Sequence, residues 1–102
     1  MDVLNLREMV SYQDGSVVSK EIIKKETGTV SLFTFDKGQG LSEHTAPFDA
    51  LVNVLDGQAE VRISSKPFIV KKDEMIIMPA NEPHSLKAIE KFKMLLVMVK
   101  SR

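Results

Sequence analysis

The sequence predicts an all-β fold, an antiparallel barrel or sandwich, and two observations support this. From position 17 onward, short segments rich in Val, Ile, Phe and Leu follow one another closely. Turn-forming pairs such as Asp14-Gly15, Asp56-Gly57 and Lys72-Asp73 lie between segments. Many short strands joined by such turns favour an antiparallel architecture over an alternating α/β one.

The length of 102 residues allows one hydrophobic core and predicts a single domain over residues 1–102, with an N-terminal arm over 1–16. Fourteen Lys and Arg balance fourteen Asp and Glu, so charge provides no general attraction to nucleic acid. The absence of Cys excludes disulfides, thiolate metal ligands and a Cys nucleophile. We find no secretion signal and no apolar run near the roughly 20 residues of a membrane helix, and therefore expect a cytoplasmic protein with no membrane partner.

The elements are expected in a simple order. Residues 4–10 are too few for an independent helix, so they should form a helical turn or short arm that packs on the body or on a partner. Alternating or continuous apolar residues then predict strands over 17–24, 29–36, 50–55, 58–63, 68–71, 74–78, 84–88 and 92–99.

Two of these strands are apolar on both faces. Segment 50–55 is interrupted only by Asn53, and residues 94–99 are six consecutive apolar residues. A strand that is apolar on both faces needs a cover on its outer side. We expect a homodimer to supply that cover; a doubly buried central strand within the monomer is the alternative.

The two histidines of the chain lie in spaced motifs. They read Gly38-x5-His44-x-Ala46-x3-Ala50-x6-Gly57 and Asp73-x5-Pro79-x-Asn81-x2-His84. Together they resemble the two motifs of the cupin family, G-x5-H-x-H-x3-E-x6-G and G-x5-P-x-G-x2-H. The resemblance covers residues 29–99 and implies a small single-domain cupin, an antiparallel double-stranded β-helix or jelly-roll β-barrel. Asp and Asn at two Gly positions tolerate turn conformations, so the turns are expected to be kept.

The resemblance also implies an incomplete metal site. Cupins usually hold a divalent metal with three His and one Glu, and here the resemblance brings only His44 and His84 together inside the barrel. Ala46 and Ala50 stand at the other two ligand positions. Two imidazoles alone make a weak site for Zn, Ni, Fe or Mn, which water or a ligand oxygen could complete. The alternative is a pair of polar residues that bond through water or to the backbone.

Nearby carboxylates do not replace the missing ligands. Glu43 and Asp49 are each adjacent to an inward position, so strand alternation should direct them outward. Only a shift of register by one residue in the turn before Asp49 would bring its carboxylate inside.

Two alanines in place of imidazole and carboxylate should leave an apolar space at the barrel mouth. The expected lining residues are Ala46, Phe48, Ala50, Val52, Met75, Ile77 and Leu86, beside Phe33, Phe35, Val54 and one face of 94–98. A mostly apolar cavity with a few polar groups is the usual form of a small-molecule site. We therefore predict binding of a small, partly apolar molecule, with His44 and His84 as polar anchors.

Two other functions remain open. One is a metal-dependent enzyme of dioxygenase, isomerase or decarboxylase type, with open metal positions for substrate. The other is an interaction scaffold, for which exposed apolar edges would be the sign. No catalytic residue is assigned.

Overall fold

The computed structural model describes residues 1–101 and confirms the predicted all-β architecture. Within this part of the chain, no helix has the length and apolar character needed to cross a membrane. The elements in order are η1 (Leu6–Glu8), β1 (Val17–Lys25), β2 (Gly28–Phe35), β3 (Gly40–His44), β4 (Phe48–Asp56), β5 (Gln58–Ile63), β6 (Lys66–Lys71), β7 (Met75–Met78), β8 (His84–Ala88) and β9 (Phe92–Lys100).

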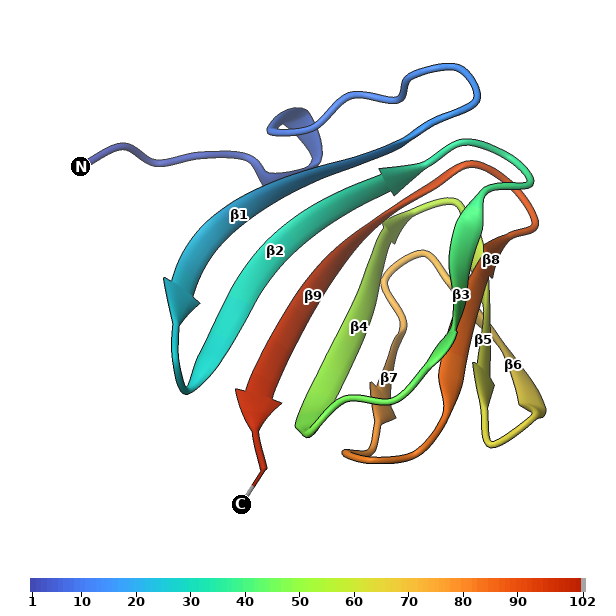
Figure 1. Ribbon diagram of the computed structural model, residues 1–102. Helices are drawn as coiled ribbons and strands as arrows, with labels where there is room; N and C mark the ends of the chain where they lie inside the picture. The colour runs from blue at the N-terminus through green and yellow to red at the C-terminus, as the bar shows by residue number, and fades with distance from the viewer. Residues whose placement is uncertain (102) are drawn as a thin grey trace.

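The strands form two antiparallel sheets. The larger sheet has the order β1-β2-β9-β4-β7, and the smaller sheet has the order β3-β8-β5-β6. Figure 1 shows the two sheets facing each other, with β1 and β2 extending beyond the smaller sheet. Only β1–β2 and β5–β6 are pairs of consecutive strands, and the other neighbours come from distant parts of the chain. β3 and β8, for example, lie side by side although about forty residues separate them.

Each of the eight predicted segments corresponds to a strand, with ends that differ by a few residues. The strand β3 was not predicted. It has the sequence Gly-Leu-Ser-Glu-His, in which Leu41 is the one large apolar residue and the other four residues are exposed, so it carries no alternating signal. This strand positions His44.

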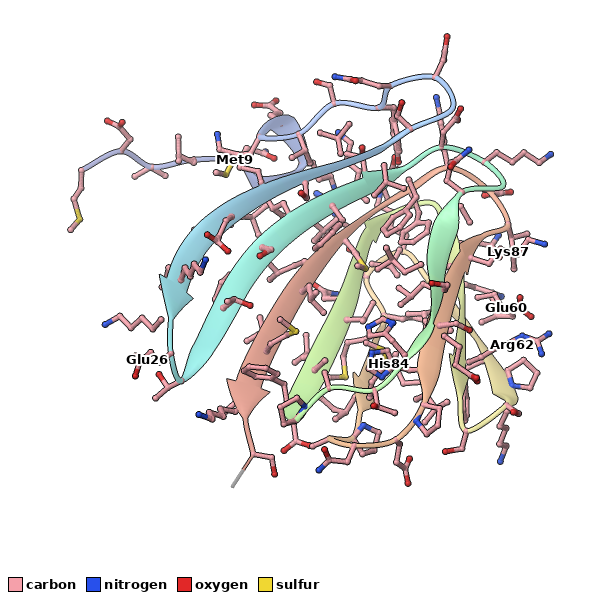
Figure 2. All side chains as sticks on the ribbon, viewed as in Figure 1. Met9, Glu26, Glu60, Arg62, His84 and Lys87 are labelled. Carbon is pink, nitrogen blue, oxygen red and sulfur yellow. The ribbon has the colours of Figure 1, made fainter. Side chains whose placement is uncertain are left out.

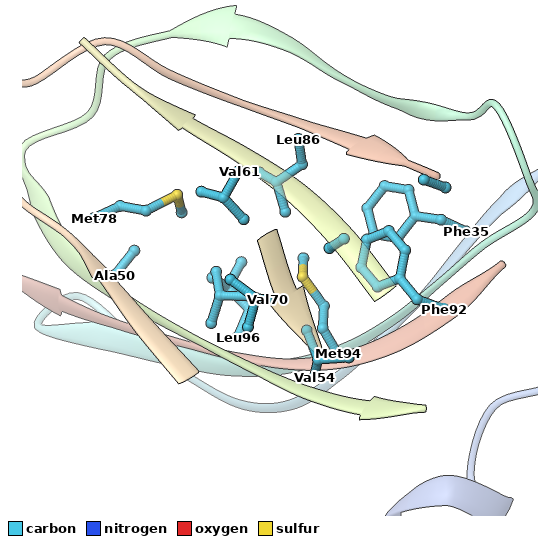
Figure 3. Packing of buried hydrophobic residues seen from close by; sticks show 13 residues of the cluster. Phe35, Ala50, Val54, Val61, Val70, Met78, Leu86, Phe92, Met94 and Leu96 are labelled. Carbon is cyan, nitrogen blue, oxygen red and sulfur yellow. The ribbon is translucent and has the colours of Figure 1, made fainter. Parts of the chain in front are cut away.

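The core lies between the sheets and is filled unevenly. The rings of Phe35 and Phe92 stack with centroids 4.5 Å apart, and both residues are fully buried. Figure 3 shows this aromatic pair at one end of the core, and the smaller Ala50 and Met78 at the other. The end that contains Ala50 is where the two histidines lie, so space remains there rather than beside the aromatic rings.

The N-terminal arm packs on the outer face of the larger sheet. Its residue Val10 forms a small apolar cluster with Leu32 and Leu55. The ammonium of Lys93 donates to the carbonyl oxygen of Val10 at 2.8 Å, and the Tyr12 hydroxyl donates to Asp56 at 2.6 Å. These contacts hold the arm on the body, as expected for a segment too short to be stable alone.

Candidate functional site

The site is formed where β3 ends and β8 begins. His44 and His84 are direct partners in the ladder between these strands, beyond an irregularity that follows Leu41. Their Nε2 atoms are 3.1 Å apart, and their rings meet edge to face with centroids 4.3 Å apart. The structure thus places the two imidazoles together, in the arrangement that the sequence resemblance implied.

The outer nitrogens of both rings bind the backbone. Nδ1 of His44 is 2.7 Å from the carbonyl oxygen of Ser42, and Nδ1 of His84 is 3.1 Å from that of Glu82. A carbonyl oxygen can only accept, so each Nδ1 must carry the hydrogen and donate it. In a neutral ring Nε2 is then an acceptor. Two Nε2 lone pairs therefore face each other, and the arrangement is favourable only with a proton, a hydrogen-bond donor or a cation between them.

The two imidazoles differ in their exposure to water. The His84 side chain is only 5% exposed, whereas His44 is exposed at the rim. Burial lowers the pKa of His84 below its ordinary value of 6.5, and charge on His44 lowers it further. The hydrogen bond to the Glu82 carbonyl acts in the opposite direction but is the smaller effect on this pKa than burial. His84 is therefore neutral at pH 7 and available to accept or to ligate.

A cavity of about 50 Å³ adjoins the imidazoles. Besides the two histidines its walls are apolar: Leu41, Ala46, Phe48, Ala50, Met78, Leu86, Met94, Leu96 and Met98. A single water needs about 10–15 Å³ and a drug-sized ligand about 300–1,000 Å³, so the space admits only a few water-sized groups as it stands. Three of the lining residues are methionines, whose unbranched side chains can change rotamer to admit more.

Four of the seven predicted lining residues do line this cavity: Ala46, Phe48, Ala50 and Leu86. Val52 also faces inward but is fully buried in the packed core and does not reach the cavity.

The placement of Met75 and Ile77 was wrong. Both lie on the outer face of β7, with 48% and 46% of their side chains exposed. The segment from Met75 to Met78 is apolar at every position, so the sequence gives no alternation from which to choose the inward pair. The ladder with β4 settles the choice, because Met78 pairs with the inward Ala50.

The sequence analysis also missed two lining residues. Leu41 was missed because β3 showed no strand pattern, and Met78 because of the wrong alternation in β7. The neighbouring carboxylates stay outside the cavity. Asp49 accepts a hydrogen bond from the backbone N–H of Ala80 at 2.9 Å, and Glu43 lines a shallow groove on the smaller sheet. Figure 2 shows His84 between the sheets, while Glu60, Arg62 and Lys87 project from the outer side of the smaller sheet.

Comparison with known proteins identifies the family. Residues 31–100 match the family described as Cupin domain. The chain is a cupin. A cupin 2 conserved barrel domain protein from Leptotrichia buccalis is 48% identical, with a TM-score of 0.93 over 95% of this chain and 47% of the other. This cupin therefore spans about half the length of that protein.

Two further solved structures are similar along most of both chains. A conserved protein of unknown function from Streptococcus pyogenes is 37% identical, with a TM-score of 0.95 over 99% of this cupin and 89% of the other chain. A cupin superfamily protein from Desulfitobacterium hafniense is 23% identical, with a TM-score of 0.91 over 96% and 90% of the two chains. No curated protein matches this chain.

The donor atoms of this cupin fit a metal ion only in part. The 3.1 Å between the two Nε2 atoms is a separation that two nitrogens on one ion can have, with bonds of about 2.0–2.1 Å. Among residues 1–101, however, no group of three or more His, Cys, Asp and Glu side chains could hold a metal. A bound ion would need its remaining ligands from water or from a second molecule.

Proposed function

We propose that this cupin binds a small, partly apolar molecule whose polar head lies at the Nε2 atoms of His44 and His84. The observation that carries this proposal is the pair of facing acceptors 3.1 Å apart, with both Nδ1 atoms already occupied by carbonyl oxygens. While both neutral rings donate from Nδ1 to these carbonyl oxygens, their Nε2 atoms cannot satisfy each other, so a guest between them is energetically favoured.

The polar head of the ligand can meet the imidazoles in two ways. A hydroxyl, amine or amide hydrogen would donate directly to one or both Nε2 atoms. A divalent metal held by His44 and His84 would instead supply positive charge that attracts an anionic oxygen, such as that of a carboxylate. In both cases the carbonyl oxygens of Ser42 and Glu82 fix the ring orientations, so the site is organised before the ligand arrives.

The walls of the cavity define the rest of the ligand. Ala46 and Ala50 expose methyl groups, and Met78 and Met98 provide adaptable apolar surface. With about 50 Å³ of free space, the head must be compact, and an apolar tail can enter only where methionine rotamers shift or toward the exposed rim at His44. This favours small alcohols, amines and short-chain carboxylic acids over larger metabolites.

The side chains that line the cavity favour binding over catalysis. The polar side chains that line the cavity are the two histidines, so no additional lining group is available to move a proton or activate water. The enzyme alternative would need ligand or solvent atoms to complete a metal site and one of the anchoring histidines to act in catalysis as well.

Thermal unfolding in the presence of small ligands tests the proposal. Short-chain alcohols, amines and carboxylic acids would be added to the protein in EDTA and, separately, in zinc chloride. A ligand at about 100 times its Kd stabilises by about 2.7 kcal/mol, which raises the Tm of a domain of this size by more than about 10 °C. We expect such a rise in at least one series, together with recovery of the ligand chemically unchanged.

Two variants make this experiment specific. His44→Ala should lose the response, and because His44 is exposed its removal should leave the fold intact. The matched control is Glu43→Ala, an adjacent substitution on the opposite face of β3, which should respond like the wild type. The absence of any response in the wild type, or an equal response in His44→Ala, would refute the proposal. Conversion of the ligand would instead support the enzyme alternative.

A further inference from the structure

Half of the methionines of this chain lie at the cavity beside the two imidazoles. The chain has six methionines, and three of them, Met78, Met94 and Met98, line the cavity of about 50 Å³ together with His44 and His84. Leucine fills a similar volume, so packing alone does not require methionine at these positions. A thioether also carries a soft lone pair that an aliphatic side chain lacks. The cavity therefore combines nitrogen and sulfur donors.

Two of these methionines flank the same inward position of the larger sheet. Ala50 of β4 pairs with Met78 of β7 on one side and with Met98 of β9 on the other, and all three pack in the core cluster. Directly paired residues have Cβ atoms about 4.5–5.5 Å apart, and the side chain of Ala50 ends at its methyl group. The two unbranched thioethers can therefore extend over Ala50, across the cavity from the histidines of the smaller sheet.

The third methionine lies farther from the imidazoles. Met94 precedes Met98 by four residues on β9, which separates the two backbone positions by about 13 Å. Figure 3 shows Met94 toward the stacked aromatic rings, whereas Met78 lies beside Ala50. Met78 and Met98 are therefore the thioethers that can reach an ion held by the histidines, and Met94 provides an internal comparison.

We propose that this cavity binds Cu(I), with Nε2 of His44 and His84 and the thioether sulfurs of Met78 and Met98 as ligands. The proposal rests on the proposed function because it uses the same two imidazoles, and it names a soft monovalent ion as their guest. Imidazole and thioether donors together suit Cu(I). Zn²⁺ in proteins takes imidazole, thiolate and carboxylate ligands instead, so it could use only half of this set.

The distance between the imidazole nitrogens calls for further ligands. Two bonds of about 2.0 Å that span the 3.1 Å between the Nε2 atoms of His44 and His84 meet at an angle of about 100°. A linear two-histidine ion would need nitrogens about 4 Å apart, whereas an angle near 100° leaves two positions of a tetrahedron open. A hard ion would fill them with water or with a second molecule. A soft ion can take the sulfurs of Met78 and Met98, so the chain itself completes a set of four donors.

The charge of the cavity also favours a monovalent ion. Among the described residues, those that line the cavity include no carboxylate, and an imidazole that binds a metal through Nε2 is neutral. The nearby carboxylate of Asp49 accepts the backbone N–H of Ala80 outside the cavity. Because the Born cost of burying an ion grows with the square of its charge, a divalent ion costs about four times as much to bury as a monovalent ion of the same size. A site without negative charge therefore selects against divalent ions.

Anaerobic competition for Cu(I) tests the site. The full chain is titrated with Cu(I) in ascorbate against the chromophoric chelator bicinchoninate, and X-ray absorption spectra of the loaded protein identify the atoms bound to copper. We expect one Cu(I) per chain, held at least about a hundredfold more tightly than Zn²⁺, with both nitrogen and sulfur bound to the metal. Binding no tighter than that of Zn²⁺, or copper without bound sulfur, would overturn the proposal.

Matched leucine substitutions identify the sulfur ligands. The double substitution Met78→Leu, Met98→Leu should remove the sulfur signal and raise the Kd for Cu(I) about a hundredfold, whereas Met94→Leu should change neither. The three methionines outside the cavity stay in every variant. Circular dichroism and thermal unfolding check that the variants fold, and the sulfur signal of the wild type decides the matter if one does not. Full Cu(I) affinity in the double variant, or an equal loss in Met94→Leu, would contradict the assigned ligands.

One further measurement separates failure of the copper site from failure of the proposed function. In EDTA, the wild type should still be stabilised by the alcohol, amine or carboxylic acid that it binds, because such a molecule can donate directly to the imidazoles without a metal. This response without tight Cu(I) binding would refute the copper site alone. Tight Cu(I) binding through sulfur with no response to any of these molecules would support the copper site and refute the proposed function.

Discussion

His84 is the residue whose protonation the fold controls. Burial lowers its pKa below 6.5, so the folded protein takes up this proton less readily than the unfolded chain. The stabilising contribution is therefore complete above pH 6.5 and is lost as the pH falls from 6.5 through the lower folded pKa. Urea unfolding of the wild type and of His84→Gln, compared from pH 8 to pH 5, measures it. We expect the wild type to lose stability relative to the variant below pH 6.5, by at most about 1.4 kcal/mol per pH unit.

The comparison between the two proteins removes the titration of the carboxylates, which both share. A stability difference that stays constant over this range, or that increases toward acid pH, would contradict burial as the cause of the lowered pKa of His84.

The residues of the site could be predicted only where the sequence has a motif or an unambiguous alternation of inward and outward residues. The spacing around His44 and His84 located both histidines, and the alanines at positions 46 and 50 marked the apolar wall. Where four apolar residues follow one another in β7, the inward pair is decided by pairing with β4, a contact between distant segments. No local pattern contains that information.

At the scale of elements, the turn between β4 and β5 should tolerate substitution least. Gly57 has φ of +76°, and a Cβ at this position would overlap the carbonyl oxygen of Lys91. Gly15 has a similar φ of +64° but open space around it. We expect Gly15→Ala to cost about 1–2 kcal/mol of unfolding free energy, the cost of the left-handed conformation alone. Gly57→Ala should cost about 3 kcal/mol or more, because backbone must also move.

Denaturant unfolding of the two glycine variants provides the measurement. Similar losses of unfolding free energy in the two variants would show that the β4–β5 turn can move away from Lys91. That result would contradict the prediction that the close approach to Lys91 makes Gly57→Ala more costly.

Strands could be predicted where their residues are packed between the sheets and not where they are exposed. β4 and β9 were evident because the core requires apolar residues on their inner faces. β3 has only Leu41 for an apolar residue, and its place is determined by its ladder with β8. His44, one of the two histidines of the site, therefore lies on the strand with the weakest pattern.

At the scale of the whole molecule, β9 borders both the cavity and the outer face of the larger sheet. Its inward residues Leu96 and Met98 line the cavity, and its outward residues Val97 and Val99 belong to the open outer face. The sequence showed that both faces of this strand are apolar. It did not show which residues the N-terminal arm would cover, because that depends on the path of the arm over Leu32 and Leu55.

The facing Nε2 atoms of the two imidazoles are the feature on which the proposed function depends, and long-range 1H–15N NMR of the imidazoles observes them directly. The spectrum of the neutral rings should show the hydrogen of each on Nδ1, and addition of zinc chloride should shift the Nε2 signals of both rings together. A hydrogen on Nε2 of His84, or a response confined to one ring, would contradict the account.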